Sequence, residues 1–520
     1  MRRQLERLRF KTQAMNNKGQ DNKKLIVNII LLCVFAAYLI FNGILLALHE
    51  PWRDEANVWL MARELSPVRL FAEIRYQGHP CLWYLIVMPF AKAGFPFRTI
   101  GFISYFIMAV TAGIYFFKAP LHPFVKAVSL FCPAFSYFYS DIARNYCLIA
   151  LILILLAVYY PKRNEKSVFY GLLLGLLVQA DTIAIAAAGM ISLMWLCENL
   201  WRGFKEKSMS AVYGILKGIW IPLASLFLWI AQFYQVSDSS EFQMRVPGFR
   251  ELLSEIRNQS LWILERLSGR HQGFCIFMLL LFLFFFIIFS VRIRNLWAAL
   301  VLVSAYLFEA VFSVMVYQLH IWHFIALCFV LVWTVWVLDF QKKERGILDR
   351  ICVGSSVGIQ ALFLVLSICM FLQWNSGEES SSLNNALHGL YSDGKGTAEY
   401  IGQNISSEEY IVSVNVSMAS TVLAYLPGYE FYFAGNGEKA SYADYNEGQR
   451  QQITFEEFMA FAREKFADKE VFYLLDSGDS CITESGQLRE YEILYRTADK
   501  TARGEEYTIY RIPVSADGMQ

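Results

Sequence analysis

The sequence predicts a polytopic α-helical membrane protein that carries a small C-terminal α/β domain. Of its 520 residues, 56% are hydrophobic and 16% are aromatic, and the apolar residues gather in long runs. Soluble domains rarely reach such a composition. Charge adds a third observation: the whole chain is net +1, whereas residues 377–520 carry 24 acidic and 11 basic side chains. Such asymmetry is typical of membrane topology and not of nucleic-acid binding.

Eleven apolar runs are candidates for membrane spans, each of which needs about 20 mainly apolar residues. The run 80–93 is shorter, and Lys92 interrupts its end, so we interpret it as an interfacial helix. The expected spans are roughly 25–48, 99–117, 124–140, 144–160, 167–180, 182–200, 211–234, 273–291, 296–318, 320–339 and 351–373.

Basic residues predict the orientation of these spans. If the basic tail 1–24 is cytoplasmic, every expected inner loop carries at least two Lys or Arg, as the positive-inside rule requires. Those loops are Lys118–Lys126, Pro161–Lys166, Arg202–Lys207, Arg292–Arg294 and Lys342–Arg350. We therefore expect a transmembrane domain at 25–374, whose first loop, 49–98, lies outside.

The region 375–520 is expected to form an extracytoplasmic α/β domain. Five segments rich in β-branched and aromatic residues predict strands. They are Tyr410–Val416, Glu430–Ala434, Val471–Asp476, Tyr491–Arg496 and Tyr507–Ile512. Thr454 and Glu457 have the spacing of a capping box that opens a helix over 455–466.

An acidic pair, Asp54 and Glu55, stands just after the first span. Two adjacent carboxylates can supply a general base together with a substrate or metal ligand. A carboxylate beside lipid would also bind protons more strongly, which suits a base. The alternative is that the pair caps a helix over 56–65.

Other polar residues are expected on the same outer side. His79 follows Gly78 at the start of the interfacial helix, where it can bind a phosphate or position a hydroxyl. Arg144 can clamp a phosphate with two hydrogen bonds, and Asp141 can orient it or hold a metal. For all three residues, a structural role at a helix end is the alternative.

Histidines and arginines late in the chain add further candidates. His320 and His323 share one helix face and, with Arg270 and His271, can form a basic pocket for a leaving phosphate. Interfacial anchoring is the alternative for the two histidines. Glu309 is expected inside a span, where it is either functional or a protonated, hydrogen-bonded acid. No Cys or His cluster supports a zinc site.

Three motifs in order resemble bacterial members of the GT-C glycosyltransferase superfamily. They are Arg53-Asp54-Glu55-Ala56, Gly78-His79-Pro80-x-Leu82-Trp83-Tyr84 and Asp141-x-Ala143-Arg144-x-Tyr146. The resemblance is to the protein-mannosyltransferase-like group, glycosyltransferase family 39, to which the lipid A aminoarabinose transferases are related. It covers about residues 25–200; the later spans agree in architecture alone.

The resemblance implies an inverting transfer of a monosaccharide from a polyprenyl-phosphate donor on the outer leaflet. Asp54 matches the first-loop aspartate that deprotonates the acceptor hydroxyl, and Arg144 is the first choice to stabilise the leaving phosphate. The implied partners are the lipid-linked donor, membrane lipids and an acceptor glycan, lipid or protein, with no nucleic acid. Because no Asp-x-Asp pair stands near Asp141, we assign no metal ligands, and a divalent cation stays open.

Two other functions remain as alternatives. A transporter or flippase would need polar residues in several spans and an internal repeat, which we do not find. A polyprenyl-linked glycan ligase or polymerase would use basic residues of a long late loop. The segment 235–272 offers such residues: Arg245, Arg250, Arg257, Arg266, Arg270 and His271. A non-catalytic assembly protein with a recruiting C-terminal domain is the third alternative.

Overall fold

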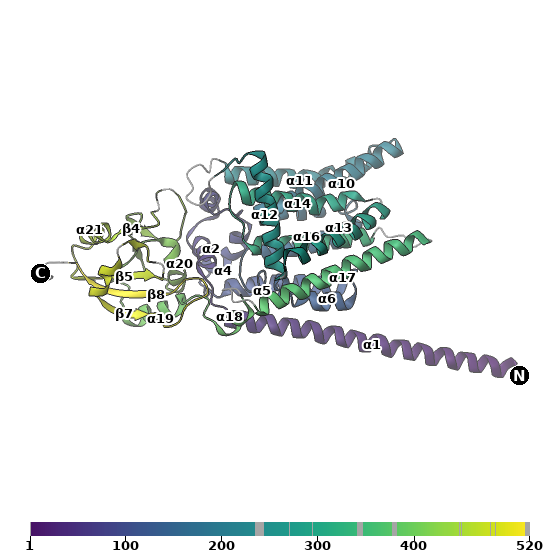
Figure 1. The fold of residues 1–520 in the computed structure, drawn as a ribbon, viewed down its shortest axis with the longest axis horizontal. Coiled ribbons are helices and arrows are strands. Elements are labelled where there is room, and N and C mark those ends of the chain that lie inside the picture. Colours follow the sequence, from purple (N-terminus) through teal and green to yellow (C-terminus); the bar gives the residue numbers. More distant parts are fainter. Residues whose placement is uncertain are drawn as a thin grey trace.

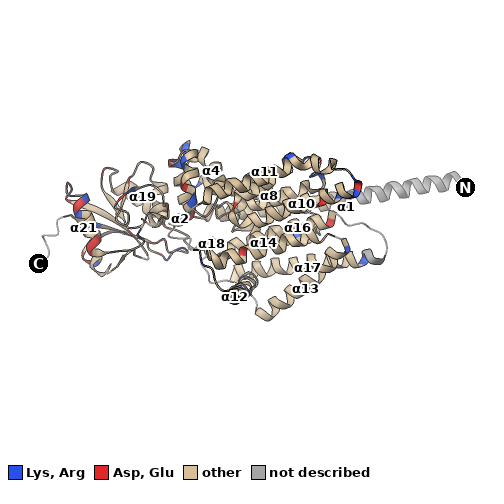
Figure 2. Cartoon of the chain, turned by 90° about the horizontal axis from the view of Figure 1, so that it is seen from above, with Lys and Arg blue, Asp and Glu red and all other residues tan. Residues whose placement is uncertain are grey.

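The computed structural model describes residues 2–234, 244–269, 271–293, 295–340, 347–376, 382–446, 448, 450–478, 480–483 and 485–514. Figure 1 shows a bundle of long helices, with a smaller domain built on a sheet at one end of the bundle. We call residues 25–376 the helical domain and residues 382–514 the C-terminal domain. Figure 2 shows charged residues mainly at the two ends of the bundle and on the C-terminal domain.

Eight helical segments in the described part of the chain are long and apolar enough to cross a membrane, which identifies a multi-pass membrane protein. The apolar segments are Leu25–Leu48, Thr99–Lys118, Thr182–Glu206, Ser210–Phe233, Gln272–Ile293, Leu296–Met315, Ile321–Phe340 and Arg350–Ser376. The corresponding helices are α1 (Arg2–Leu48), α5 (Thr99–Lys118), α10 (Ile185–Glu206), α11 (Ser210–Phe233), α13 (Gln272–Ile293), α14 (Leu296–Met315), α16 (Ala326–Phe340) and α17 (Ile347–Ser376).

The expected count of eleven spans is not confirmed. The runs 144–160 and 167–180 form the shorter helices α8 (Tyr146–Tyr159) and α9 (Ser167–Ala180). The run 124–140 is broken into α6 (Pro123–Leu130), α7 (Pro133–Ser136) and a non-helical stretch. Pro133 explains the break, since proline lacks the amide hydrogen and disfavours a helical residue before it.

Figure 1 shows α2 (Arg53–Glu64), α4 (Leu82–Lys92) and the 20-residue helix α12 (Phe249–Ser268) toward the end of the bundle that meets the C-terminal domain. Further short helices of the helical domain are α3 (Pro67–Glu73), η1 (Ile74–Tyr76), α15 (Ile321–Phe324), η2 (Tyr160–Lys162) and η3 (Thr182–Ala184). The expected helix over 80–93 is thus α4. The expected helix over 56–65 is α2, which begins three residues earlier, so the acidic pair lies inside its first turn.

The C-terminal domain holds a six-stranded mixed sheet in the order β3-β2-β1-β5-β8-β7. Its strands are β1 (Ile411–Ser413), β2 (Phe431–Phe433), β3 (Glu438–Ala440), β5 (Val471–Ser477), β7 (Glu492–Arg496) and β8 (Tyr507–Pro513), and a separate pair joins β4 (Ile453–Thr454) to β6 (Ile482–Thr483). The helices are α18 (Leu383–His388), α19 (Gly394–Asn404), α20 (Val416–Tyr425), α21 (Phe455–Lys465) and η4 (Ser485–Glu490). The five expected strands and the capping box at Thr454 are confirmed.

Two sets of buried hydrogen bonds dock the C-terminal domain on α2. Glu505 is 1% exposed, and its carboxylate accepts the backbone N–H of Arg53 at 2.9 Å. Asn57 exchanges two hydrogen bonds with the backbone of Ala443, at 3.0 and 2.8 Å. Because buried polar groups are costly to leave unpaired, these contacts fix the domain relative to the first turns of α2.

Candidate active site

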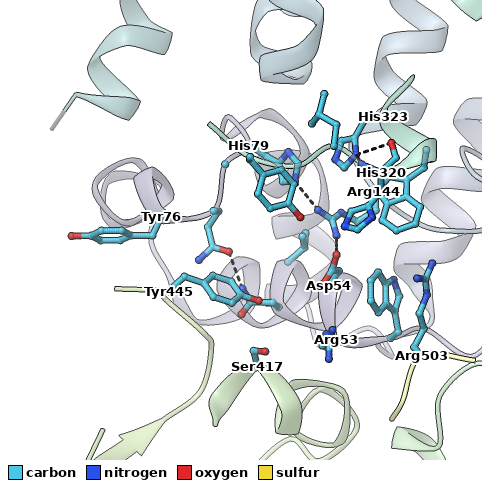
Figure 3. A pocket seen from close by; sticks show the side chains of 18 of the residues that line it. Arg53, Asp54, Tyr76, His79, Arg144, His320, His323, Ser417, Tyr445 and Arg503 are labelled. Atoms are coloured by element: carbon cyan, nitrogen blue, oxygen red, sulfur yellow. Dashed lines mark hydrogen bonds and ion pairs between the residues drawn. The ribbon is translucent and has the colours of Figure 1, made fainter. Parts of the chain in front are cut away.

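A cavity of about 770 Å³ lies between the two domains. The helical domain lines it with residues from α2, the turn before α4, the start of α8, η3 and α15, and the C-terminal domain closes the other side. Figure 3 shows side chains from both domains pointing into the same space. The volume falls in the range of small-molecule sites.

Asp54, Arg144 and His79 meet at one wall of the cavity (Figure 3). Nη1 of Arg144 donates to Oδ2 of Asp54, and its Nη2 lies 2.6 Å from Nε2 of His79. These residues come from three separate segments of the chain. The fold therefore brings together the central residues of all three sequence motifs.

Asp181 extends this group to a fourth residue. Its Oδ2 lies 3.2 Å from Nδ1 of His79 and accepts a hydrogen bond from Nδ2 of Asn145 at 2.6 Å. Its Oδ1 accepts the backbone N–H of Ile183 at 3.0 Å. We call Asp54, Arg144, His79 and Asp181 the ionic relay, because each contacts the next.

Local backbone breaks place the relay residues. After Pro133 ends the helical run, residues 137–145 pass through turns, and the N–H of Arg144 bonds to the carbonyl of Ile142 at 2.8 Å. Gly78 has φ +71°, a left-handed conformation that suits glycine, and it turns the chain so that His79 faces the cavity. The hydroxyl of Thr182 donates to the carbonyl of Gly78 at 3.2 Å and holds this turn against η3.

The structure separates the acidic pair. Glu55 is fully buried outside the cavity, where Oε2 accepts the backbone N–H of Trp52 and lies 3.0 Å from Nε2 of His49. Its Oε1 accepts the N–H of Ala143 at 2.6 Å. Glu55 thus caps α2 and ties it to the segment that carries Arg144, as the capping alternative predicted. Asp54 alone of the pair lines the cavity.

The environment of Asp54 reverses one expectation. Burial by itself would raise the pKa of Asp54, but the positive charges of Arg144 and Arg53 outweigh it, and the pKa is lowered. The expectation of a raised proton affinity was wrong because the sequence did not show that Arg144 would pair with this carboxylate. At neutral pH Asp54 is therefore ionised.

His320 and His323 border the same cavity. Nδ1 of His323 accepts the N–H of His320 at 3.0 Å, and Nε2 lies 3.0 Å from the hydroxyl of Tyr146. The ring of His320 stacks on Trp322, with centroids 4.5 Å apart. Within the described part of the chain, no group of three His, Cys, Asp or Glu side chains is arranged to hold a metal ion.

Four other candidates lie elsewhere or outside the described residues. Asp141 is fully buried and does not line the cavity. His271 is exposed and also lies outside it, while Arg270 is not among the described residues. Glu309 is buried in α14 and likewise does not reach the cavity.

Arg503 is the main residue that the sequence analysis missed. It comes from the turn between β7 and β8 and lines the cavity from the C-terminal domain. Arg53, Tyr84, Tyr146 and Tyr445 also line it without having been assigned to it. The turn around Arg503 carries no motif; a glycine and two acids follow it, as in many surface hairpins. Tertiary structure alone reveals its position.

Comparison with solved structures identifies the fold. ArnT from Cupriavidus metallidurans in the apo state matches with a TM-score of 0.55 at 12% sequence identity, over 95% of this chain and 99% of that one. The chain has a GT-C fold. The same ArnT bound to undecaprenyl phosphate gives a TM-score of 0.48 at 11% identity, over 94% and 99% of the two chains. No protein-family model and no curated protein matches this sequence.

Proposed function

We propose that this protein transfers a monosaccharide from a polyprenyl-phosphate donor to an acceptor hydroxyl, with inversion at the sugar carbon. The observation that carries the proposal is an ionised aspartate, Asp54, paired with Arg144 in a cavity between the domains of a GT-C fold. The resemblance of the three motifs to the family 39 group supports the same chemistry. So does the concentration of arginine and histidine around the cavity, which suits a phosphate.

The proposed reaction is a single displacement. A carboxylate oxygen of Asp54 takes the proton of the acceptor hydroxyl while the acceptor oxygen bonds to C1 of the sugar. The bond between C1 and the phosphate oxygen breaks, and the electron pair leaves with the polyprenyl phosphate. Attack from the face opposite the leaving group inverts C1.

Arg144 has two tasks in this proposal. Its charge keeps Asp54 ionised in a buried place, and its field stabilises the charge that develops on the departing phosphate. His79 and Asp181 fix the guanidinium from the other side, so that Arg144 is already oriented before substrates bind.

We place the cavity on the outer face of the membrane. The proposal rests on the Lys and Arg residues of the predicted inner loops, which the positive-inside rule assigns to the cytoplasm. The C-terminal domain is then extracytoplasmic, and the donor is reached from the outer leaflet. The acceptor is a glycan, a lipid or a protein.

The ligase alternative would use basic residues of the late loop, and those that the structure describes lie away from this cavity. Arg245 pairs with Glu251 and Glu255 on the surface. The other described arginines of the late loop, Arg250, Arg257 and Arg266, do not line the cavity either. The transporter alternative predicts flux of a lipid-linked sugar across proteoliposomes without loss of the sugar from its carrier.

Asp54→Asn tests the proposed base. We expect purified enzyme, assayed with a panel of undecaprenyl-phosphate-linked hexoses and pentoses and envelope extract as acceptor, to lose sugar transfer by about 100- to 10,000-fold. The matched control is Glu64→Gln, which changes an exposed acid at the end of the same helix. Wild-type rates in Asp54→Asn would refute the assignment, and flux without transfer would favour a transporter.

A further inference from the structure

Arg503 lies in a turn that is fixed both within the C-terminal domain and to the helical domain. The N–H of Ala502 bonds to the carbonyl of Leu390 at 2.8 Å, and Gly504 has φ +65°, which lets the chain reverse after Arg503. Two residues on, the carboxylate of Glu505 binds the backbone N–H of Arg53. The position of Arg503 is therefore tied to the first turn of the helix that carries Asp54.

Three aromatic rings enclose the guanidinium of Arg503. Its central carbon lies 4.4 Å from the ring centroid of Trp52, 5.0 Å from that of Trp322 and 5.2 Å from that of Tyr391. Nε donates to the hydroxyl of Tyr391 at 2.6 Å. The three rings stabilise the cation, and its Nη groups donate no hydrogen bond to the described residues.

Arg503 takes part in none of the ion pairs formed by the described residues, although burial of a charge favours pairing. Of the other two arginines of the cavity, Arg144 has both Nη groups engaged and Arg53 has one. Arg144 gives its Nη groups to Asp54 and His79, and Nη1 of Arg53 contacts the sulfur of Met418 at 3.0 Å. Among the described residues, the Nη groups of Arg503 have no hydrogen-bond acceptor, so both are left for an incoming anion.

The surroundings of Arg503 suit an anion that is attached to an apolar chain. Trp52 follows the membrane-spanning segment Leu25–Leu48, and Trp322 is the second residue of the segment Ile321–Phe340, so both lie near the ends of spans, where tryptophan is favoured. Arg503 and Arg144 also border one small cavity together with the apolar side chains of Phe138 and Ile142. Cations and apolar groups therefore adjoin each other at this point.

We propose that Arg503 binds the phosphate of the lipid-linked donor, so that the C-terminal domain supplies a donor-binding residue to the site in the helical domain. This rests on the proposed function. Arg503 would hold the phosphate before and during bond cleavage, while Arg144 stays paired with Asp54. The C-terminal domain is then part of the donor site and not an accessory to it.

A purely structural role is the competing explanation, in which Arg503 clamps the two domains through its aromatic contacts. The two roles differ in what they do to a ligand without charge. Loss of a phosphate-binding group weakens binding of the phosphate alone. A docking defect distorts the whole cavity and weakens binding of the phosphate and of the uncharged polyprenol alike.

The experiment measures equilibrium binding of undecaprenyl phosphate and of undecaprenol to the full-length protein in lipid nanodiscs. We expect Arg503→Gln to bind the phosphate about 10- to 100-fold more weakly, since a charge-assisted hydrogen-bonded pair is lost, and to bind undecaprenol as the wild type does. The affinity of Arg503→Lys for the phosphate should lie between those of the wild type and Arg503→Gln, because lysine keeps the positive charge but lacks the paired donors of a guanidinium. Arg511→Gln, an exposed arginine on β8, is the matched control and should match the wild type.

Two results would overturn the assignment: wild-type affinity of Arg503→Gln for the phosphate, or an equal loss for phosphate and alcohol. A separate assay of sugar transfer by the wild type shows whether the role of Arg503 has failed or the proposed function has failed. Transfer together with unchanged phosphate binding in Arg503→Gln refutes the role of Arg503 alone. Phosphate-selective loss in an enzyme that transfers no sugar refutes the proposed reaction and leaves Arg503 as a phosphate-binding residue.

Discussion

The two walls of the cavity differ in chemistry. The helical domain contributes the ionic relay, in which Asp54, Arg144, His79 and Asp181 contact one another in sequence. The described residues that the C-terminal domain adds are uncharged apart from Arg503, and they include the polar side chains of Asn415, Ser417, Tyr445, Gln451 and Gln452. Charges that hold one another in place suit proton transfer and charge stabilisation, whereas amides and hydroxyls suit recognition of a neutral polar substrate. We therefore expect the reaction at the first wall and substrate recognition at the second.

Removal of Arg144, the cation of the ionic relay, gives the strongest test of whether the helical-domain wall carries the reaction. Arg144→Ala should lower kcat/KM for sugar transfer by about 100- to 1,000-fold, because Asp54 loses its partner and the leaving phosphate loses a stabilising charge. Steady-state transfer assays measure the effect. His271→Ala is the control, since His271 is exposed and outside the cavity, and we expect it to match the wild type. A loss in both variants would mean that the relay is not the reacting wall.

Mutation of the adjacent residue Glu55 should lower the stability of the fold and leave the rate of sugar transfer unchanged. Glu55→Ala leaves the N–H groups of Trp52 and Ala143 and the ring of His49 without their buried acceptor, so it should destabilise the fold by about 3–5 kcal/mol. Thermal unfolding in detergent measures this, with Asp54→Asn for comparison. The folded fraction of Glu55→Ala should keep its transfer rate. A stable but inactive Glu55→Ala would show that Glu55 acts in the reaction.

The pH dependence of the transfer rate tests whether Arg144 keeps Asp54 ionised. Because the pKa of Asp54 is lowered in the folded state, the stability that its ionised form contributes is complete above the unfolded pKa of about 4 and is lost as pH falls through the folded value. Transfer should therefore show no loss from Asp54 at pH 5. In Arg144→Ala, burial raises the pKa of Asp54, and the acid limb of the rate profile should move to higher pH. An unmoved limb would show that Asp54 is not the titrating base.

A smaller effect is expected on the uncharged wall. Ser417 lines the cavity from the first turn of α20, and removal of its hydroxyl in Ser417→Ala should raise the KM for the acceptor by about 2- to 10-fold with kcat unchanged. The split between KM and kcat checks whether this wall recognises or reacts. A fall in kcat without a change in KM would contradict the division between the two walls.

The sequence predicted the fold well where apolar length or strand composition was decisive. The long runs and the five strands were found, because hydrophobic runs and β-branched segments reflect local physical requirements. The run 124–140 was interpreted as a span although it contains Pro133, and this proline breaks it. That break matters for the site, because the non-helical stretch that follows carries Arg144 to Asp54.

The candidate site was predicted in part. Asp54, His79, Arg144, His320 and His323 were chosen for residue type and for their side of the membrane, and they line one cavity. The different positions of Asp54 and Glu55 could not be foreseen, since adjacent residues in the first turn of a helix point in directions that only the neighbouring segments define. Arg503 could not be found either, because its aromatic neighbours come from three distant segments.

The hydrogen bond between Glu505 and the backbone of Arg53 joins residues that are 452 positions apart in the chain. At the usual pace of translation, about 5–20 residues per second, roughly 20–90 s separate the synthesis of these two residues. During that interval the spans enter the membrane while the cavity still lacks Arg503 and the contact that anchors α2. Under the proposed function, we therefore expect no sugar transfer from a nascent chain before its C-terminal domain has folded.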